Sequence, residues 1–144
     1  MRIISGKFKG KRIPSFGKIE ARPTTDFAKE GLFNVLNNHI DFEGLAVLDL
    51  FAGTGSISFE LISRGSARVI AVEMNEKHCG YIRKIANELD VTELIVHRAD
   101  AFRFVSTCKM KFDLIFADPP YQHNGLTALP DLIFEHDLDR KSVV

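Results

Sequence analysis

From Gly44 onward, short apolar runs alternate with amphipathic stretches, and this alternation constrains the fold more than any other feature of the sequence. Buried strands that alternate with helices are typical of a parallel sheet covered by helices. The strands are predicted at 46–51, 69–73, 93–97 and 112–117. The helices are predicted at 56–64, from a cap at Asn75 to Leu89, at 101–105 and beyond Pro130. We therefore expect an α/β fold with a Rossmann-like, three-layer arrangement and a mostly parallel sheet.

The residues before Gly44 predict two further elements. Residues 1–14 read as a short β-hairpin appendage turned by glycines, and Pro23 then holds the chain extended ahead of a helix that Thr25 or Asp26 can cap. Apolar residues near the helical period predict that this helix lays one face on the sheet. They are Phe27, Leu32, Val35, Leu36 and Ile40. We expect a basic extension at 1–22 and a main domain at 23–144.

The formal net charge of zero conceals a basic arm on an acidic domain. Residues 1–22 hold seven basic residues and one acid, a balance of +6, so the remainder holds 12 basic and 18 acidic residues, a balance of −6. Such an arm predicts contact with a polyanionic partner, and a merely solvated charged hairpin is the alternative.

Glycines and acidic residues fall where the predicted strands end, which is where ligands bind in open parallel sheets. The turn Gly53-Thr54-Gly55 lets backbone amides approach a ligand. Glu73 can accept hydrogen bonds from both hydroxyls of a ribose, and Asp100 from an adenine amino group, with Phe102 packed on the ring. The pattern predicts a bound adenosine moiety.

Two residues qualify this prediction. Ser58 stands where a dinucleotide fingerprint needs glycine or alanine, which argues against a dehydrogenase. Asp49, inside the first strand, is either a cofactor ligand or a structural carboxylate that supports the turn, and both roles are compatible.

The fourth strand ends in Asp118-Pro119-Pro120-Tyr121, the most specific feature of the sequence. The prolines remove two backbone donors and stiffen the chain, so carbonyl oxygens and a carboxylate are left to accept hydrogen bonds from an amino group. Tyr121 offers a face on which a base can stack. This pattern favours methyl transfer to an exocyclic amine, with Asp118 assisting proton loss. The alternative is a proline-rich loop after a core strand.

Four motifs together resemble the bacterial small-subunit ribosomal RNA guanine-N2 methyltransferase family, and the resemblance covers most of the chain. They are Met1-Arg2-Ile3-Ile4-Ser5-Gly6, Arg22-Pro23-Thr24-Thr25-Asp26, Asp49-Leu50-Phe51-Ala52-Gly53-Thr54-Gly55 and Asp118-Pro119-Pro120-Tyr121. The resemblance implies a class I methyltransferase that uses S-adenosyl-L-methionine, flips its target base and acts on ribosomal RNA or a small-subunit assembly particle. It implies a catalytic base site at Asp118, Pro119, Pro120 and Tyr121. The implied cofactor site is Asp49, Phe51, Ala52, Gly53, Thr54, Gly55, Glu73, Asp100 and Ala101. The implied RNA contacts are Arg2, Lys7, Lys9, Lys11, Arg12, Arg22 and Thr24.

The sequence departs from the family at its end. Sheets of this class have seven strands and only four are predicted, while 139–144 match no family element, so we expect a truncated or frameshifted product with an exposed apolar edge beyond the fourth strand. The competing functions are a DNA adenine-N6 methyltransferase, which the length and the Arg-Pro-Thr segment disfavour, and an inactive RNA-binding remnant.

Composition sets the remaining expectations. The hydrophobic share of 45% and the absence of any apolar run near 20 residues predict a globular protein outside the membrane. Two unpaired cysteines suit a reducing compartment, and the five histidines lack the spacing of metal ligands. We expect a cytoplasmic monomer without a metal.

Overall fold

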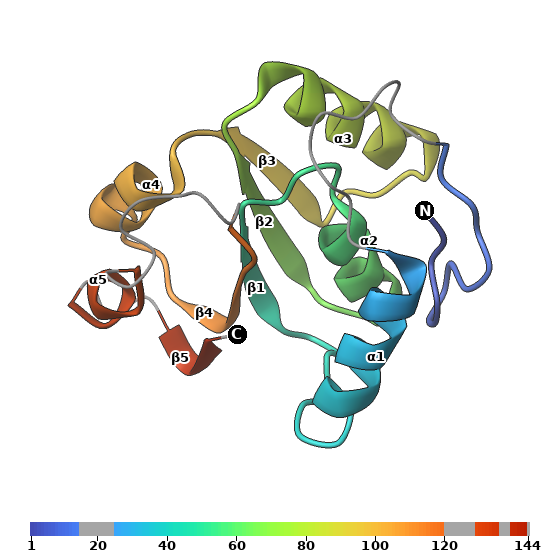
Figure 1. Ribbon diagram of the computed structural model, residues 1–144, viewed down its shortest axis with the longest axis horizontal. Coiled ribbons are helices and arrows are strands. Elements are labelled where there is room, and N and C mark those ends of the chain that lie inside the picture. The colour runs from blue at the N-terminus through green and yellow to red at the C-terminus, as the bar shows by residue number, and fades with distance from the viewer. Residues whose placement is uncertain (15–24, 120–128, 136–138, 144) are drawn as a thin grey trace.

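The computed structural model describes residues 1–14, 25–119, 129–135 and 139–143. Within these ranges five parallel strands form one sheet in the order β3-β2-β1-β4-β5 (Figure 1). The strands are β1 (Ala46–Leu50), β2 (Arg68–Glu73), β3 (Leu94–Arg98), β4 (Phe112–Ala117) and β5 (Asp139–Val143). The helices are α1 (Asp26–Leu36), α2 (Ser56–Ser63), α3 (Glu76–Glu88), α4 (Ala101–Thr107) and α5 (Leu129–Glu135).

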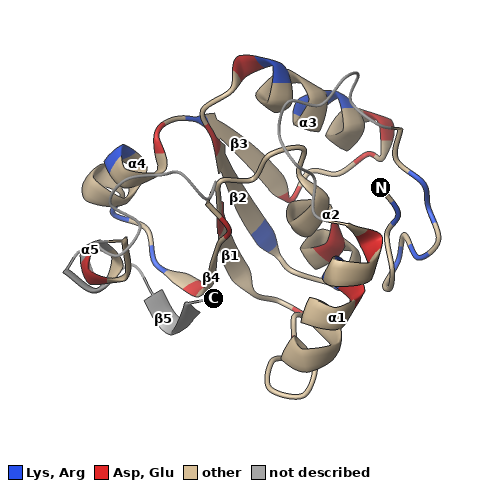
Figure 2. Cartoon of the chain, viewed as in Figure 1, with Lys and Arg blue, Asp and Glu red and all other residues tan. Residues whose placement is uncertain are grey.

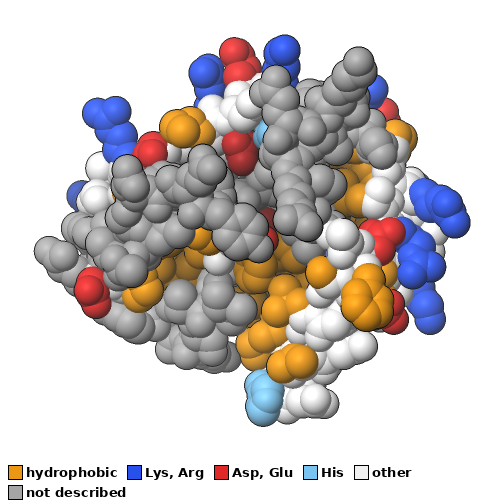
Figure 3. Space-filling model, in the orientation of Figure 1, with side chains coloured by type: hydrophobic (Ala, Val, Ile, Leu, Met, Phe, Trp, Pro, Cys, Tyr) orange, Lys and Arg blue, Asp and Glu red, His pale blue; other side chains and the backbone are white. Residues whose placement is uncertain are grey.

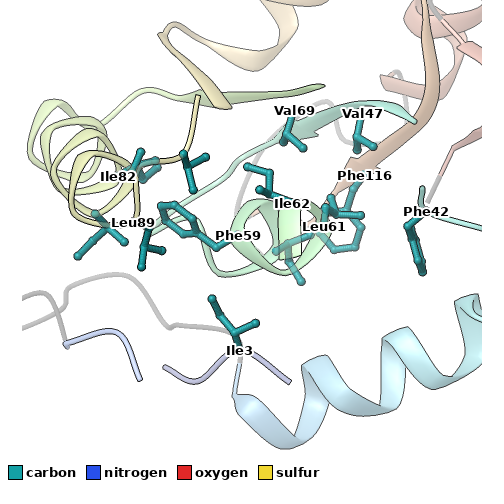
Figure 4. Packing of buried hydrophobic residues seen from close by; sticks show 14 of the residues in the cluster. Ile3, Phe42, Val47, Phe59, Leu61, Ile62, Val69, Ile82, Leu89 and Phe116 are labelled. Carbon is teal, nitrogen blue, oxygen red and sulfur yellow. The ribbon is translucent and has the colours of Figure 1, made fainter. Parts of the chain in front are cut away.

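Two apolar cores hold the helices to opposite faces of the sheet. Because side chains alternate along a strand, Val47 belongs to one core and its neighbour Leu48 to the other. The first core contains side chains of α1, α2 and α3, and Figure 4 shows α2 between the strand residues and Ile3 of the N-terminal segment. The second core contains side chains of α4 and α5. The expected three-layer α/β arrangement is confirmed.

The expected face of α1 is wrong in part. Its buried residues are Lys29 and Phe33, with Phe33 only 1% exposed. Phe27 is 88% exposed and Val35 60% exposed. Only a narrow strip of the helix therefore meets the core, and the periodic apolar pattern alone overstated its width. The cap is as predicted, because the Thr25 hydroxyl accepts a hydrogen bond from Ala28 N at 3.1 Å.

Residues 1–14 double back as predicted, with an antiparallel bridge between Arg2 and Arg12. They also contribute to the first core, because Ile3 is fully buried and Ile13 is 4% exposed there. The segment lies against α2 and closes that core from below in Figure 4. Residues 1–14 are therefore packed on the main domain, and the predicted boundary at residue 22 lies outside the described residues.

A buried carboxylate fixes this segment to the helices. Glu60 of α2, fully buried, accepts hydrogen bonds from the backbone amides of Ile4 and Ser5 at 2.8 and 3.1 Å. Its oxygens also lie 3.5 Å from Lys29 Nζ and 2.9 Å from Arg64 Nε. Burial lowers the pKa of Lys29, an effect that the nearby Glu60 carboxylate opposes. The charges thus compensate one another inside the core.

The expectation of four strands with an open edge beyond β4 is wrong. Residues Asp139–Val143 form β5, which pairs in parallel with β4 and carries a register shift near Phe112. The run Asp-Arg-Lys-Ser has no apolar alternation, so its side chains gave no signal for a strand. The backbone donors and acceptors along the edge of β4 supply the driving force instead.

Candidate functional site

The strand order reverses between β1 and β4, because the chain steps from β1 through β2 to β3 and then returns to the other side of β1. In open parallel sheets a ligand binds beyond the carboxyl ends of the strands at such a point. The predicted acidic residues Asp49, Glu73 and Asp118 come from β1, β2 and the end of β4, respectively. The carboxylates of Glu73 and Asp118 both act electrostatically on Asp49. The structure therefore gathers these three residues at one edge.

Glu73 fastens the glycine turn to the end of β2. Its Oε1 accepts a hydrogen bond from Gly53 N at 2.9 Å, and its Oε2 accepts one from Asn75 N at 2.8 Å. His78 Nδ1 lies 3.9 Å from the same Oε2. A carboxylate offers about four acceptor positions, so both oxygens retain capacity for a ligand hydroxyl. Glu73 thus has a structural role that the sequence did not indicate, and its contact with a ribose stays a prediction.

Asp49 is 1% exposed, and its Oδ2 accepts a hydrogen bond from the Ser58 hydroxyl at 2.6 Å. Burial raises the pKa of Asp49 to about 7; the hydrogen bond from Ser58 opposes this rise, and the charge of Glu73 adds to it. This contact favours the structural role for Asp49. Ser58, which the sequence argument used only to reject a dinucleotide fingerprint, is the residue that supports it. Polar serines inside the apolar run of α2 were the available signal.

The first turn of α2 closes the glycine turn tightly. Gly55 has φ +85°, and a Cβ there would lie 3.0 Å from Phe59 and 3.1 Å from Ile82, so a side chain would be strained by the backbone and would have to displace both neighbours slightly. A Cβ at Gly53 would meet nothing within 4 Å, so open space adjoins the turn. Among the described residues, the hydroxyl of Ser56 is a buried polar group with no hydrogen-bond partner. A buried hydroxyl without a partner at a helix N-terminus suits a polar ligand group.

On the β3 side, the expected adenine contacts sit at the start of α4. Asp100 caps this helix, since its Oδ1 accepts a hydrogen bond from Arg103 N at 3.1 Å. The half-buried ring of Phe102 meets Phe51 of the glycine turn edge to face, with ring centroids 6.3 Å apart. Ala101, the first residue of α4, is buried. The aromatic pair thus joins α4 to the carboxyl end of β1.

The structure describes only part of the predicted base site and RNA surface. Asp118 is exposed and Pro119 half-buried directly after β4, whereas Pro120 and Tyr121 lie outside the described residues. Arg22 and Thr24 also lie outside them. Of the predicted basic contacts, Lys7 pairs with Glu93 at 3.2 Å, and Arg2, Lys9, Lys11 and Arg12 are exposed. Figure 2 shows this basic stretch along the N-terminal segment.

The described residues show neither a metal site nor a helix that could span a membrane. They contain no group of three or more His, Cys, Asp or Glu side chains placed to hold a metal ion. None of their helices combines the length and apolar character that crossing a membrane requires.

Known proteins share both the sequence and the fold of this chain. The family model described as Conserved hypothetical protein 95 matches residues 1–144. The chain is 37% identical over 142 residues to the putative rRNA methyltransferase YlbH of Bacillus subtilis, an alignment that covers 96% of the chain and 76% of that protein. It is 34% identical over 122 residues to ribosomal RNA small subunit methyltransferase D of Buchnera aphidicola, with 85% of the chain and 62% of that protein covered.

The solved structure of the putative methyltransferase yhhF from Escherichia coli superposes with a TM-score of 0.83 at 28% identity, and the match covers 100% of the chain and 76% of that structure. The chain thus spans 62% of the length of the Buchnera protein and 76% of the other two. The names of the Bacillus and Buchnera relatives agree with the family that the sequence motifs resemble. Because the family model matches the whole chain, the chain belongs to the Conserved hypothetical protein 95 family.

Proposed function

We propose that this chain carries the catalytic fold of an S-adenosylmethionine-dependent methyltransferase that modifies the exocyclic N2 amino group of a guanine in small-subunit ribosomal RNA. One observation carries the proposal: Asp49, Glu73 and Asp118 converge beside an open glycine turn at the point where the strand order reverses. The names of the Bacillus and Buchnera relatives support the class of reaction and of substrate.

The residues at this edge fit the cofactor by charge and by shape. The methionine end of S-adenosylmethionine is polar and its sulfonium is a cation, which the nearby acidic residues of β1 and β2, Asp49 and Glu73, attract. The buried hydroxyl of Ser56 and the open space at Gly53 suit the amino-acid group. Glu73 would hold the ribose hydroxyls and Phe102 the adenine ring. When bound, the cofactor supplies an electrophilic methyl group whose bond to sulfur breaks as the bond to nitrogen forms.

The chain's own contribution is to position the amine and remove its proton. The lone pair of a guanine N2 is delocalised into the ring, so the amine is a poor nucleophile unless acceptors hold both of its protons in a reactive orientation. The exposed carboxylate of Asp118 and the carbonyl oxygen of Pro119 follow β4 directly, at the edge of the sheet where the cofactor would bind. Asp118 accepts the proton that the nitrogen loses as it gains the methyl group.

Calorimetric titration with S-adenosylmethionine and transfer of labelled methyl groups to small-subunit ribosomal RNA test this proposal together. We expect binding by the wild-type chain and label in N2-methylguanosine after digestion to nucleosides. Asp118→Asn should keep cofactor affinity within about twofold and lose at least about 100-fold in transfer rate, the usual scale of general acid-base catalysis. A folded chain that binds no cofactor refutes the proposal. Label in N6-methyladenosine of duplex DNA identifies a DNA enzyme instead, and RNA binding without cofactor binding identifies an inactive remnant.

A further inference from the structure

An exposed surface of two arginines and one phenylalanine lies where the N-terminal segment meets the start of α1. Arg2 and Arg12 face each other across the antiparallel bridge. Asp26 Oδ1 accepts a hydrogen bond from Arg2 N at 2.9 Å, which places the first turn of α1 beside that bridge. The next residue, Phe27, is 88% exposed. We call Arg2, Arg12 and Phe27 the arginine–phenylalanine surface.

The two guanidinium groups are available to an anion. Among the described residues neither Arg2 nor Arg12 forms an ion pair, whereas Lys7 at the far end of the same segment is paired with Glu93. Arginine suits phosphate because its planar fork can donate two parallel hydrogen bonds. The cations nearest α1 are therefore better placed to hold phosphates than the lysine at the tip.

The backbone beneath these side chains is held firmly. Lys29 Nζ donates a hydrogen bond to Arg2 O at 2.6 Å, and the buried Ile3 and Ile13 anchor both arms of the bridge in the core. The Tyr81 hydroxyl of α3 also donates to the carbonyl oxygen of Pro14. A surface with a fixed backbone loses little conformational entropy when it binds a ligand, so less of the binding free energy is spent on ordering it.

The surroundings match a nucleotide better than a folded protein. A hollow of about 450 Å³ adjoins the bridge and is lined by Met1, Arg2, Arg12, Ile13, Pro14 and Asp26. This volume is within the range of ligand sites, about 300–1,000 Å³. Figure 3 shows the basic side chains of the N-terminal segment beside hydrophobic side chains at the start of α1, with white and red atoms between them. Cations next to a single aromatic ring are typical of single-stranded nucleic acid sites, whereas a protein partner requires a broader apolar face.

The geometry points to a nucleotide-binding subsite at the arginine–phenylalanine surface, where a base of the RNA that flanks the target stacks on Phe27 while its phosphates bind Arg2 and Arg12. This inference rests on the proposed function and adds a second contact away from the catalytic edge. Figure 1 shows that α1 begins beside the N-terminal segment and ends near the amino end of β1, so RNA bound here runs along the α1 side of the molecule.

Five variants test the subsite by fluorescence anisotropy with a labelled small-subunit ribosomal RNA transcript at several salt concentrations. Phe27→Ala should weaken binding about 5- to 100-fold with an unchanged salt dependence, the effect of losing one stacked base, and Phe27→Tyr should retain the affinity. Val35→Ala, which shortens another exposed apolar side chain of α1, should change affinity less than about twofold. Arg2→Gln should reduce the salt slope by about one, and Lys7→Gln should reduce it less, because Lys7 already has a partner.

The outcomes separate this inference from the proposed function. Equal affinities for Phe27→Ala and Val35→Ala would overturn the subsite even if the wild-type chain transfers methyl groups. A Phe27→Ala chain that binds naked RNA normally but fails only on ribosomal particles would also overturn it, because the ring would then contact a protein. If the wild-type chain binds RNA but transfers no methyl group, and Phe27→Ala lowers the RNA affinity, the subsite would be supported and the proposed methyltransferase activity refuted.

Discussion

Gly6→Ala is expected to lower the free energy of unfolding by about 4 kcal/mol, because the N-terminal segment passes directly against the backbone of α2 at this residue. Gly6 has φ +87°, which costs an alanine about 1–2 kcal/mol by itself. A Cβ there would lie 1.8 Å from the carbonyl oxygen and 2.3 Å from the carbonyl carbon of Ser63. No side-chain rotation can relieve a contact with backbone atoms, so the segment must move away from the helix.

That movement breaks the hydrogen bonds that hold the segment to Ser63. They are Lys7 N to Ser63 O at 2.8 Å, Phe8 N to Ser63 Oγ at 3.0 Å and Ser63 Oγ to Ser5 O at 2.5 Å. Each contributes about 1 kcal/mol net, which brings the total with the backbone strain to about 4–5 kcal/mol. If the whole segment detaches, exposure of Ile3 and Ile13 lowers the free energy of unfolding by about a further 2 kcal/mol each.

Gly10→Ala is the matched control. Gly10 has φ +81°, nearly the same backbone conformation, but a Cβ there would meet nothing within 4 Å, so only the strain of about 1–2 kcal/mol applies. Urea unfolding of both variants, followed by far-ultraviolet circular dichroism, measures the difference. If the two variants lose equal stability within about 0.5 kcal/mol, the N-terminal segment does not rest on α2 as described, and the reasoning is refuted.

Two further predictions concern buried charges. Asp49→Asn should flatten the pH dependence of stability. The pKa of Asp49 is about 7 in the folded state and its ordinary value is 3.8, so the free energy of unfolding of the wild type falls by up to about 4 kcal/mol as the pH rises from about 4 to 7. The variant should not show this fall, and its side chain can still accept the hydrogen bond from Ser58. Urea midpoints across that range decide it, and parallel curves for the two proteins would contradict it. Glu60→Gln should cost about 3–5 kcal/mol because it removes the buried charged partner of Lys29, while Lys29→Met should cost less, since Glu60 keeps Arg64 and two backbone amides. Equal losses in thermal unfolding would mean that the Lys29–Glu60 pair does not set the stability of this region.

The elements that the sequence predicted well are those whose side chains face a core on a regular period. The strand Phe112–Ala117 has its predicted bounds, and Asn75 caps α3 through hydrogen bonds to its Oδ1 from Lys77 and His78 at 2.9 and 3.1 Å. β5 was missed because pairing with a neighbouring strand, which a single segment does not encode, determines it. The face of α1 was overestimated because Phe27 and Val35 fit the period but have no layer to pack on.

At the site, the predicted strand topology was more informative than the chemistry of the individual residues. Knowing that the strands are parallel was enough to bring Asp49, Glu73 and Asp118 to one edge. The partners of these residues were not predictable, because the Ser58 hydroxyl reaches Asp49 only after α2 has packed across β1. The same limit applies to Glu60, whose charge in an apolar helix signals burial but does not name Lys29 as its partner.

Helix α2 joins the two surfaces on which the proposed activity depends. Its first turn carries Ser56, directly after the glycine turn, and Ser58, which contacts Asp49; its second turn carries Glu60 and Ser63, which hold the N-terminal segment. These ends are about 12 Å apart on a helix of eight residues that is buried along its length, so it moves as one rigid unit. A change that releases the basic segment from the last turn therefore also removes packing from the helix that supports Asp49. For this reason RNA-binding defects at Glu60 or Gly6 must be compared with cofactor affinity, whereas Phe27, which is exposed and anchors nothing, isolates the RNA contact alone.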